Sequence, residues 1–125
     1  MRANLLRYAS DFHLEFHSLQ HPKLIPYWEF QKNKNCNYHL ALLGDIGNPL
    51  QKNLHLFFEK ISPKYQKIYY VPGNHEYYNL DQQIIRPKEE FDLQLINLCK
   101  KFSNIILMNN KIDYIDDTKI IGSTL

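Results

Sequence analysis

Short apolar segments alternate with helical patterns over most of the chain, and this alternation constrains the fold more than any other feature. Six segments rich in β-branched and aromatic residues are predicted to be strands: Leu5–Ala9, His39–Leu43, Lys67–Val71, Ile105–Met108, Ile112–Ile115 and Lys119–Ile121. Two of the intervals between them carry apolar residues at helical spacing. A strand, helix, strand, helix, strand order is typical of parallel strands joined by right-handed crossovers. We therefore predict that residues 1–108 form an α/β layer.

The two predicted helices follow the second and the third strand. The first has its apolar residues at helical spacing and is ended by Pro63; these residues are Leu50, Leu54, Phe57, Phe58 and Ile61. The second has a similar stripe of Phe91, Leu95, Leu98 and Phe102. Its first turn is acidic, with Glu89 and Glu90 after Pro87, and its end is basic, with Lys100 and Lys101. That distribution of charge stabilises a helix through its dipole.

The remaining parts of the chain lack this pattern. Residues 14–38 contain two prolines and Trp28 without clear periodicity, so we predict a long loop with one short helical turn. Near the end, Asn109-Asn110 and Asp116-Asp117 are turn dipeptides that separate short strands. We predict an antiparallel meander there.

Length, charge and cysteine content exclude several classes of protein. A chain of 125 residues has room for one domain or part of one, and its net charge of +2 is too small to indicate a polyanionic partner. Cys36 and Cys99 lie far apart without a metal-binding spacing, so neither a disulfide framework nor a zinc knuckle is predicted. No apolar run approaches the ~20 residues of a membrane span, and no signal-peptide pattern opens the chain. We expect a cytoplasmic protein that does not enter a membrane.

Residues of metal-binding type follow each of the first three predicted strands. Asp11 and His13 follow the first strand, Asp45 follows the second, and Asn74 and His75 follow the third. Each residue taken alone is explained better by a helix cap or a tight turn than by a metal site. Because the carboxyl ends of parallel strands share one rim of a sheet, however, we expect the five side chains to converge. Carboxylate, amide and imidazole groups together are what a site for two divalent cations requires.

Four stretches of the sequence resemble the calcineurin-like metallophosphoesterase superfamily. They are ASDFHLEF, LALLGDIGN, YVPGNHEYY and IIGSTL, which begin at residues 9, 40, 70 and 120. The resemblance implies an α/β fold in which two mixed sheets form a sandwich flanked by helices, with a binuclear metal centre on one rim. It also implies hydrolysis of a phosphoric mono- or diester by a metal-activated water.

The resemblance assigns a role to each of the five residues. Asp11 and His13 would bind the first metal ion, Asp45 would bridge both ions, and Asn74 would bind the second through its side-chain oxygen. His75 would not bind metal; it would act as the general acid or stabilise charge on the phosphoryl group. The ions would be Mn, Fe, Zn or Ni, which all accept this mixture of ligands.

The same family completes its site with histidines from a C-terminal half, whereas this chain has no histidine after His75. The resemblance covers nearly all of this chain but only about half of a usual family member. We therefore expect residues 1–125 to be the C-terminally truncated first half of the domain, holding one metal ion or none by itself. An oligomer, or a partner segment that supplies the missing histidines, would complete the site.

Two functional hypotheses follow. The first is a phosphoric ester hydrolase with a phosphoester substrate; within it a nuclease stays open, although no basic stripe with interleaved aromatic residues indicates nucleic acid. The second is a degenerate, inactive domain that acts as an interaction module or as part of a split protein. The metal content of the purified protein distinguishes the two hypotheses.

Overall fold

The computed structural model describes residues 2–79 and 85–124, so Met1, residues 80–84 and Leu125 lie outside the described part. Its elements, in chain order, are β1 (Ala3–Ala9), η1 (Ile25–Tyr27), β2 (Cys36–Leu43), α1 (Lys52–Ile61), η2 (Ser62–Lys64), β3 (Lys67–Val71), η3 (His75–Tyr77), α2 (Lys88–Lys100), β4 (Ile105–Leu107), β5 (Lys111–Ile115) and β6 (Thr118–Gly122). All six predicted strands and both predicted helices are therefore confirmed. The predicted helical turn within residues 14–38 is the short 3-10 helix η1.

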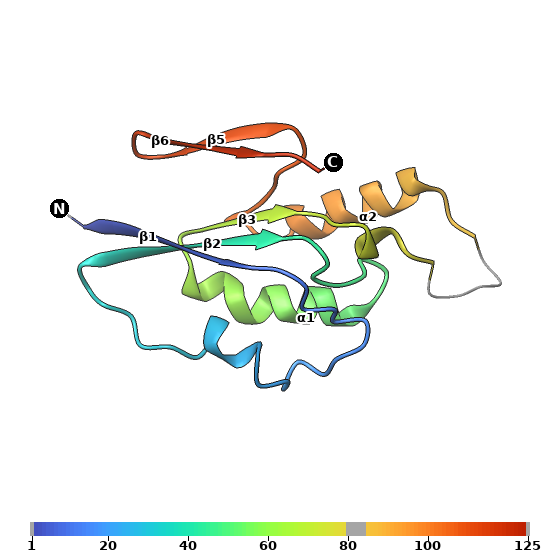
Figure 1. The fold of residues 1–125 in the computed structure, drawn as a ribbon, viewed down its shortest axis with the longest axis horizontal. Helices are drawn as coiled ribbons and strands as arrows, with labels where there is room; N and C mark the ends of the chain where they lie inside the picture. Colours follow the sequence, from blue (N-terminus) through green and yellow to red (C-terminus); the bar gives the residue numbers. More distant parts are fainter. Residues whose placement is uncertain (1, 80–84, 125) are drawn as a thin grey trace.

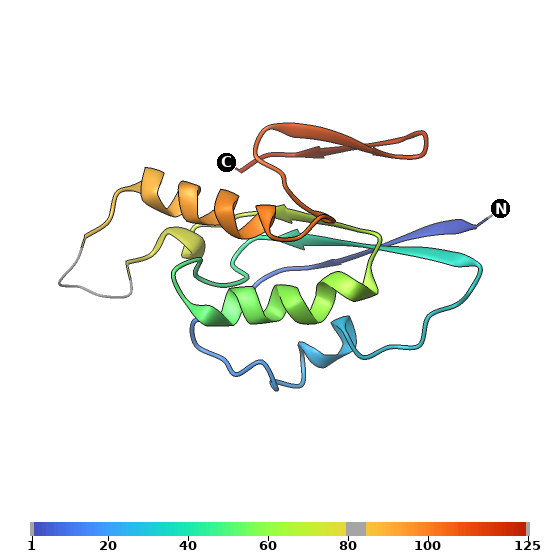
Figure 2. The same cartoon turned by 180° about the vertical axis from the view of Figure 1, so that it is seen from behind.

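The first four strands form one parallel sheet in the order β1-β2-β3-β4 (Figure 1). Each strand thus pairs with its neighbour in sequence, as right-handed crossovers on one face require. Both long helices lie on the same side of the sheet (Figure 2). The carboxyl ends of β1, β2 and β3 therefore open onto one rim, as the sequence predicted.

The main core lies between this sheet and the helices. Helix α1 buries Leu54, Phe57, Phe58 and Ile61, whereas Leu50, predicted as part of the same stripe, precedes the helix and is exposed. Helix α2 buries Phe91, Leu95, Leu98 and Cys99. The long loop before β2 closes over α1, since Trp28 packs its ring against Phe57 at a centroid distance of 6.0 Å. This loop is a packed part of the core and fixes the first strand end in place.

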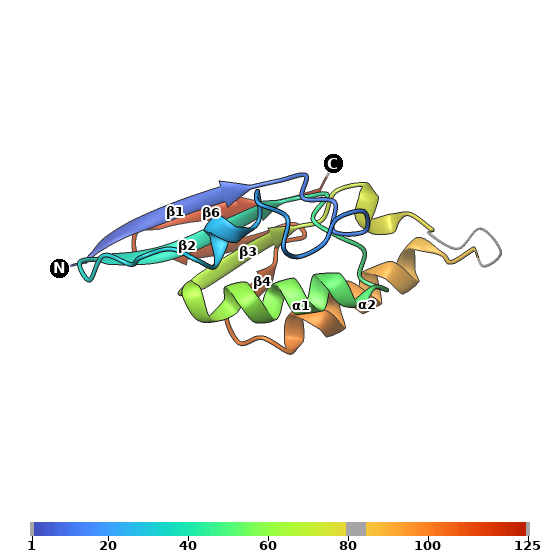
Figure 3. The same ribbon diagram turned by 90° about the horizontal axis from the view of Figure 1, so that it is seen from below.

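Strands β5 and β6 form a separate antiparallel pair on the opposite face of the sheet (Figure 3). The predicted antiparallel segment at the end of the chain is confirmed as the β5–β6 pair, and β4 lies in the parallel sheet, as predicted for residues 1–108. Tyr69, Met108 and Ile115 form a small second core between the two layers. The two-sheet α/β arrangement is thus confirmed, although each sheet in the described residues is of one kind rather than mixed.

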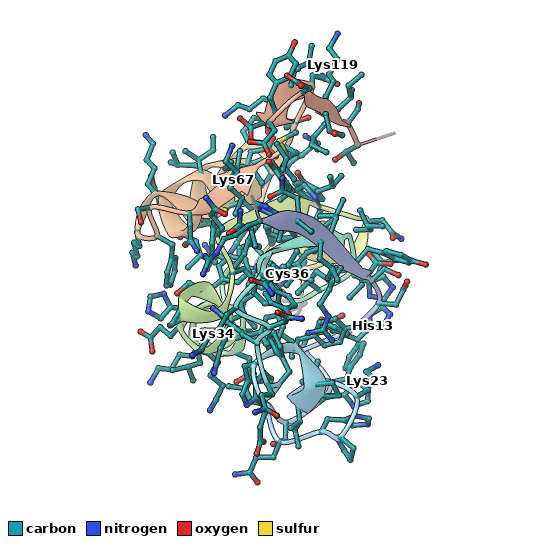
Figure 4. The ribbon with its side chains drawn as sticks, turned by 90° about the vertical axis from the view of Figure 1, so that its left-hand side faces the viewer. His13, Lys23, Lys34, Cys36, Lys67 and Lys119 are labelled. Carbon is teal, nitrogen blue, oxygen red and sulfur yellow. The ribbon has the colours of Figure 1, made fainter. Side chains whose placement is uncertain are left out.

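Asp113 of β5 anchors the hairpin to the sheet. Its carboxylate accepts hydrogen bonds from the Tyr69 hydroxyl at 2.6 Å and from the Lys67 ammonium at 2.9 Å. Figure 4 looks along the strands and shows Lys67 on the sheet and Lys119 on the hairpin. The hydrogen bond from Tyr69, followed by that from Lys67, lowers the pKa of Asp113. This carboxylate therefore stabilises the fold in its ionised form.

We predict that Asp113→Asn lowers the free energy of unfolding by about 1–2 kcal/mol at pH 7. This is less than the roughly 1.5–3 kcal/mol of a buried hydrogen bond to a charged group, because the Asp113 side chain is 30% exposed and water screens its charge. Because the folded-state pKa of Asp113 lies below its unfolded value, the contribution is complete above about pH 4 and is lost as the pH falls through the folded-state pKa. Urea denaturation between pH 7 and pH 2.5 should show that the free energy of unfolding decreases less with falling pH in Asp113→Asn than in the unmodified protein. Asp117→Asn, at the exposed hairpin turn, is the control; an identical pH dependence in both variants would contradict the prediction.

Both cysteines are free, Cys36 half-buried and Cys99 buried, and burial raises the pKa of the Cys99 thiol to about 12. Neither takes part in a disulfide, as predicted. None of the helices in the described ranges is long and apolar enough to cross a membrane.

Candidate metal centre

The loops after β1 and β2 continue side by side beyond the ends of their strands. The backbone N–H of Asp11 donates to the carbonyl of Gly44 at 3.0 Å, and that of His13 donates to the carbonyl of Asp45 at 3.0 Å. A third bond, from Leu14 N–H to the Ile46 carbonyl, measures 2.8 Å. The two strand ends are thus held together by backbone hydrogen bonds before any side chain is considered.

Three of the predicted site residues have a left-handed backbone. The φ angles are 59° at Asp11, 50° at His13 and 56° at Asp45. Only a few per cent of non-glycine residues have positive φ, although Asp, Asn and His tolerate it better than most. Such strained residues cluster at functional sites, where the surrounding structure holds them in place. The left-handed backbone raises the conformational free energy at these three positions. It also gives the three polar side chains their orientation.

These three side chains converge. One ligand atom from each of Asp11, His13 and Asp45 can be chosen so that all lie within 4.8 Å of one another. His13 Nε2 is 3.6 Å from Asp11 Oδ1, and the Asp11 side chain is 62% exposed, so the group opens to solvent. A hydrogen bond from Ser10, with His13 as a smaller cause, lowers the pKa of Asp11 and keeps its carboxylate ionised.

The third strand end reaches the same place. The backbone N–H of His75 donates to Asp45 Oδ1 at 2.9 Å, which joins the loop after β3 to the loop after β2. The side-chain amide nitrogen of Asn74 donates a hydrogen bond to the Tyr78 hydroxyl at 3.0 Å. The amide oxygen of Asn74 is the atom that could bind a metal ion. The rings of His75 and His13 lie in an edge-on arrangement with centroids 4.5 Å apart.

Glu76 holds the loops after β2 and β3 together, a role that the sequence did not reveal. Its side chain is fully buried, and its oxygens accept hydrogen bonds from four donors: the backbone N–H groups of Asp45, Ile46 and Gly73 and the Tyr70 hydroxyl, at 2.6–3.0 Å. Burial raises the pKa of Glu76, while the hydrogen bonds act in the opposite direction. Its position next to His75 was visible in the sequence, but the inward direction of its side chain was not.

Glu15 is the second acidic residue that sequence reasoning missed. Its side chain is only 2% exposed, and its Oε1 lies 3.3 Å from His13 Nδ1 and 3.1 Å from His75 Nδ1. The stretch ASDFHLEF places it two residues after His13, and no property of the sequence alone shows that it turns toward both histidines.

Gly73 allows the loops after β2 and β3 to approach closely. A Cβ atom at this position would collide with Asp45 Oδ1 and would lie 2.8 Å from the Asp45 backbone nitrogen. The absence of a side chain at Gly73 is therefore a condition for the observed place of Asp45.

Two further features surround this rim. Lys23 donates from its ammonium group to the Asp11 carbonyl at 3.1 Å, and Figure 4 shows Lys23 and His13 on the same side of the molecule. A cavity of about 330 Å³ lies beside Asn74 and is lined by Gly73, Asn74, Tyr77, Lys88 and Thr124. A positive charge and a hollow thus adjoin the converging side chains.

Asp11, His13 and Asp45 together fit a divalent cation. Two carboxylates and one imidazole supply oxygen and nitrogen donors, and their spacing is compatible with metal–ligand bonds of about 2.0–2.2 Å. The ring nitrogen of His13 that faces Asp11 is Nε2, because Nδ1 faces Glu15.

Comparison with known proteins places these features in a family. The family model described as calcineurin-like phosphoesterase matches residues 8–122. An uncharacterized protein of Acanthamoeba polyphaga mimivirus is 55% identical over 123 residues, which are 97% of this chain and 44% of that protein.

A solved structure shows the same fold. The phosphopantetheinyl hydrolase of Mycobacterium tuberculosis superposes with a TM-score of 0.60 and 21% sequence identity, over 89% of this chain and 37% of the hydrolase. The chain thus spans less than half the length of either protein. With the family model matching nearly its whole length, this chain belongs to the calcineurin-like phosphoesterase family.

Proposed function

We propose that the rim formed by the ends of β1, β2 and β3 binds divalent cations and hydrolyses a phosphoric mono- or diester. The observation that carries the proposal is the convergence of Asp11, His13 and Asp45 within 4.8 Å, on backbone that is left-handed at all three positions. Membership of a phosphoesterase family supports the class of reaction.

Each residue is proposed to act as the sequence suggested. Asp11 and His13 would bind the first cation, Asp45 would be a ligand of both, and Asn74 would bind the second through its amide oxygen. When bound, divalent cations such as Mn, Fe, Zn or Ni supply Lewis-acid catalysis and activate the attacking water. His75 is the proposed general acid: its Nδ1 faces Glu15, which leaves Nε2 as the ring nitrogen for the leaving group.

The surroundings of the rim suit a phosphoester. Lys23 places a positive charge beside Asp11, where it offsets the charge of a phosphoryl oxygen. The cavity beside Asn74 has room for the group attached to the phosphate, and Lys88 and Tyr77 line it. We propose that this cavity, rather than the larger hollow near Lys32 and Lys64 at the other end of the sheet, receives the substrate.

We further propose that residues 1–125 form the metal-binding first half of a larger domain. The mimivirus relative is more than twice as long as the matched region, and of the ligands that the family resemblance implies for the second cation this chain supplies Asp45 and Asn74. The remaining ligands would come from a C-terminal segment, a partner chain or a second copy. On this proposal the chain alone binds one cation more tightly than the second.

We predict that Asp45→Asn lowers the affinity for Mn²⁺ by more than about 100-fold, because loss of a ligand exceeds the 10- to 100-fold effect of losing a group that merely orients one. Hydrolysis of p-nitrophenyl phosphate and bis-p-nitrophenyl phosphate should fall with it. Isothermal titration calorimetry and a colorimetric assay measure the two effects. Asp117→Asn is the matched control, and unchanged Mn²⁺ affinity in Asp45→Asn would rule out the bridging role.

A second candidate function is an inactive interaction module. Large apolar side chains are exposed on both sheets, at Leu6, Tyr8, Leu43, Ile112, Tyr114 and Ile121. Exposed apolar patches of this kind mark surfaces that another protein segment covers. Two metal ions per chain together with hydrolysis support the enzyme, whereas a stable folded monomer that binds no metal supports the interaction module.

A further inference from the structure

The Glu15 carboxylate lies between the two histidines of the rim. Oε1 is 3.3 Å from His13 Nδ1 and 3.1 Å from His75 Nδ1, and both imidazole side chains are about one-quarter exposed. Among the described residues these two nitrogens are its hydrogen-bond partners, and Oε2 is buried without one.

Burial of this carboxylate is not explained by the stability of the fold. An acidic group that loses water without full hydrogen bonding costs free energy, and Glu15 has no lysine or arginine partner among the described ion pairs. Glu76 is different, since four donors satisfy its two oxygens and three of them are backbone groups of the loops. The side-chain hydrogen-bond partners of Glu15 among the described residues are the two imidazoles to which a role in metal binding or catalysis is proposed.

A shared acceptor at both Nδ1 atoms determines the tautomer of each ring. A neutral imidazole carries one N–H, so donation from Nδ1 leaves Nε2 with its lone pair free. For His13 this free nitrogen is the one that lies 3.6 Å from Asp11 Oδ1, on the side of the proposed cation. The orientation of a metal-binding histidine is commonly set by a carboxylate in this way.

We propose that Glu15 is a positioning residue that holds His13 and His75 in one orientation and in the Nδ1–H tautomer. One carboxylate thereby couples the proposed metal ligand of the first strand end to the proposed general acid of the third. The acid is the doubly protonated form of His75, in which Nδ1–H still donates to Glu15 and Nε2–H is the proton given to the leaving group. The edge-on contact of the two rings and the Tyr78 ring, 4.3 Å from His75, restrict the same orientation. This inference deepens the function proposed above and rests on it for the roles of the two histidines.

An alternative use of the same atoms is direct metal binding. Ligand atoms of His13, Glu15 and His75 also lie within 4.8 Å of one another. A cation there would occupy the Nδ1 of His13, and Glu15 would then be a ligand instead of a hydrogen-bond acceptor. The number of ions bound per chain, with and without Glu15, distinguishes the two uses.

The first experiment reads the tautomers in the metal-free protein. Long-range ¹H–¹⁵N NMR of the 125-residue chain at pH 8 should show His13 and His75 as Nδ1–H imidazoles, the minor form of free histidine. Glu15→Ala should convert both to mixed or Nε2–H tautomers, and Glu15→Gln, which keeps one acceptor oxygen, should give an intermediate result. Glu59→Ala is the matched control, because Glu59 contacts His55 on the surface at 2.7 Å. Unchanged His13 and His75 signals in a folded Glu15→Ala or Glu15→Gln protein would overturn the proposal.

The second experiment is a calorimetric titration with Mn²⁺. Glu15→Ala should weaken binding about 10- to 100-fold with the same number of ions per chain. One ion fewer per chain would overturn the positioning role and make Glu15 a ligand. If the unmodified chain binds no cation while the tautomers still depend on Glu15, the proposed function fails and the positioning role stands.

Discussion

Replacement of Glu76 by alanine is expected to lower the free energy of unfolding by roughly 3–5 kcal/mol. The carboxylate is fully buried and accepts hydrogen bonds from three backbone N–H groups and the Tyr70 hydroxyl. Its removal leaves four donors without an acceptor, two of them in buried hydrogen bonds and two in partly buried ones, and a cavity between the loops after β2 and β3. Since a domain of this size is stable by only about 5–15 kcal/mol, the variant should be close to unfolding at 37 °C.

Urea denaturation followed by circular dichroism measures this loss. Glu76→Gln keeps the side-chain volume and one acceptor oxygen, so its loss should be smaller than that of Glu76→Ala. Glu59→Ala is the control on the surface of α1, where the Glu59–His55 pair contributes about 0.5 kcal/mol or less. Equal stability of Glu76→Ala and Glu59→Ala would contradict the role given to Glu76.

Replacement of Gly73 by alanine is expected to reduce the affinity for Mn²⁺ about 10- to 100-fold, as loss of a group that orients a ligand does. The added methyl group would collide with the Asp45 carboxylate and with its backbone nitrogen, so the loop after β2 must move. Metal sites tolerate ligand displacements of only about 0.2 Å. The effect should appear in calorimetric titration of the folded variant, together with a stability loss of about 1–3 kcal/mol from overpacking.

Gly122→Ala provides the comparison. A methyl group at Gly122 would collide with the Met108 side chain in the hairpin layer, which also destabilises the fold but does not touch Asp45. The variant should therefore lose stability and keep its Mn²⁺ affinity. Equal Mn²⁺ affinities in Gly73→Ala and Gly122→Ala would show that the approach of Gly73 to Asp45 does not determine the geometry of the site.

The elements of the fold could be predicted because their patterns are local. Apolar runs such as Lys67–Val71 and the stripe ending at Ile61 coincide with β3 and α1. The turn dipeptide Asp116-Asp117 likewise coincides with the turn between β5 and β6. The position of the β5–β6 pair against the sheet depends on contacts among Tyr69, Met108 and Ile115, which no local pattern encodes.

The place of the candidate site followed from one rule, that parallel strands end at a common rim. Asp11, His13 and Asp45 converge there, while their assignment as metal ligands stays a prediction. The rule could not reveal Glu15 and Glu76, because the direction and burial of these carboxylates depend on contacts across 60 and 31 residues of sequence. Nor did composition indicate the left-handed backbone at three of the positions.

The strictly sequential order of the parallel sheet has a consequence for biosynthesis. Each new strand adds beside the one made just before it, so the sheet can grow in the direction of translation, at about 5–20 residues per second. The residues of the rim all precede α2 and the hairpin in the sequence; they are Asp11, His13, Asp45 and Glu76. The residues proposed to bind cations can therefore come together before α2 and the hairpin have been synthesised, so the order of the strands allows a metal ion to bind before those elements form.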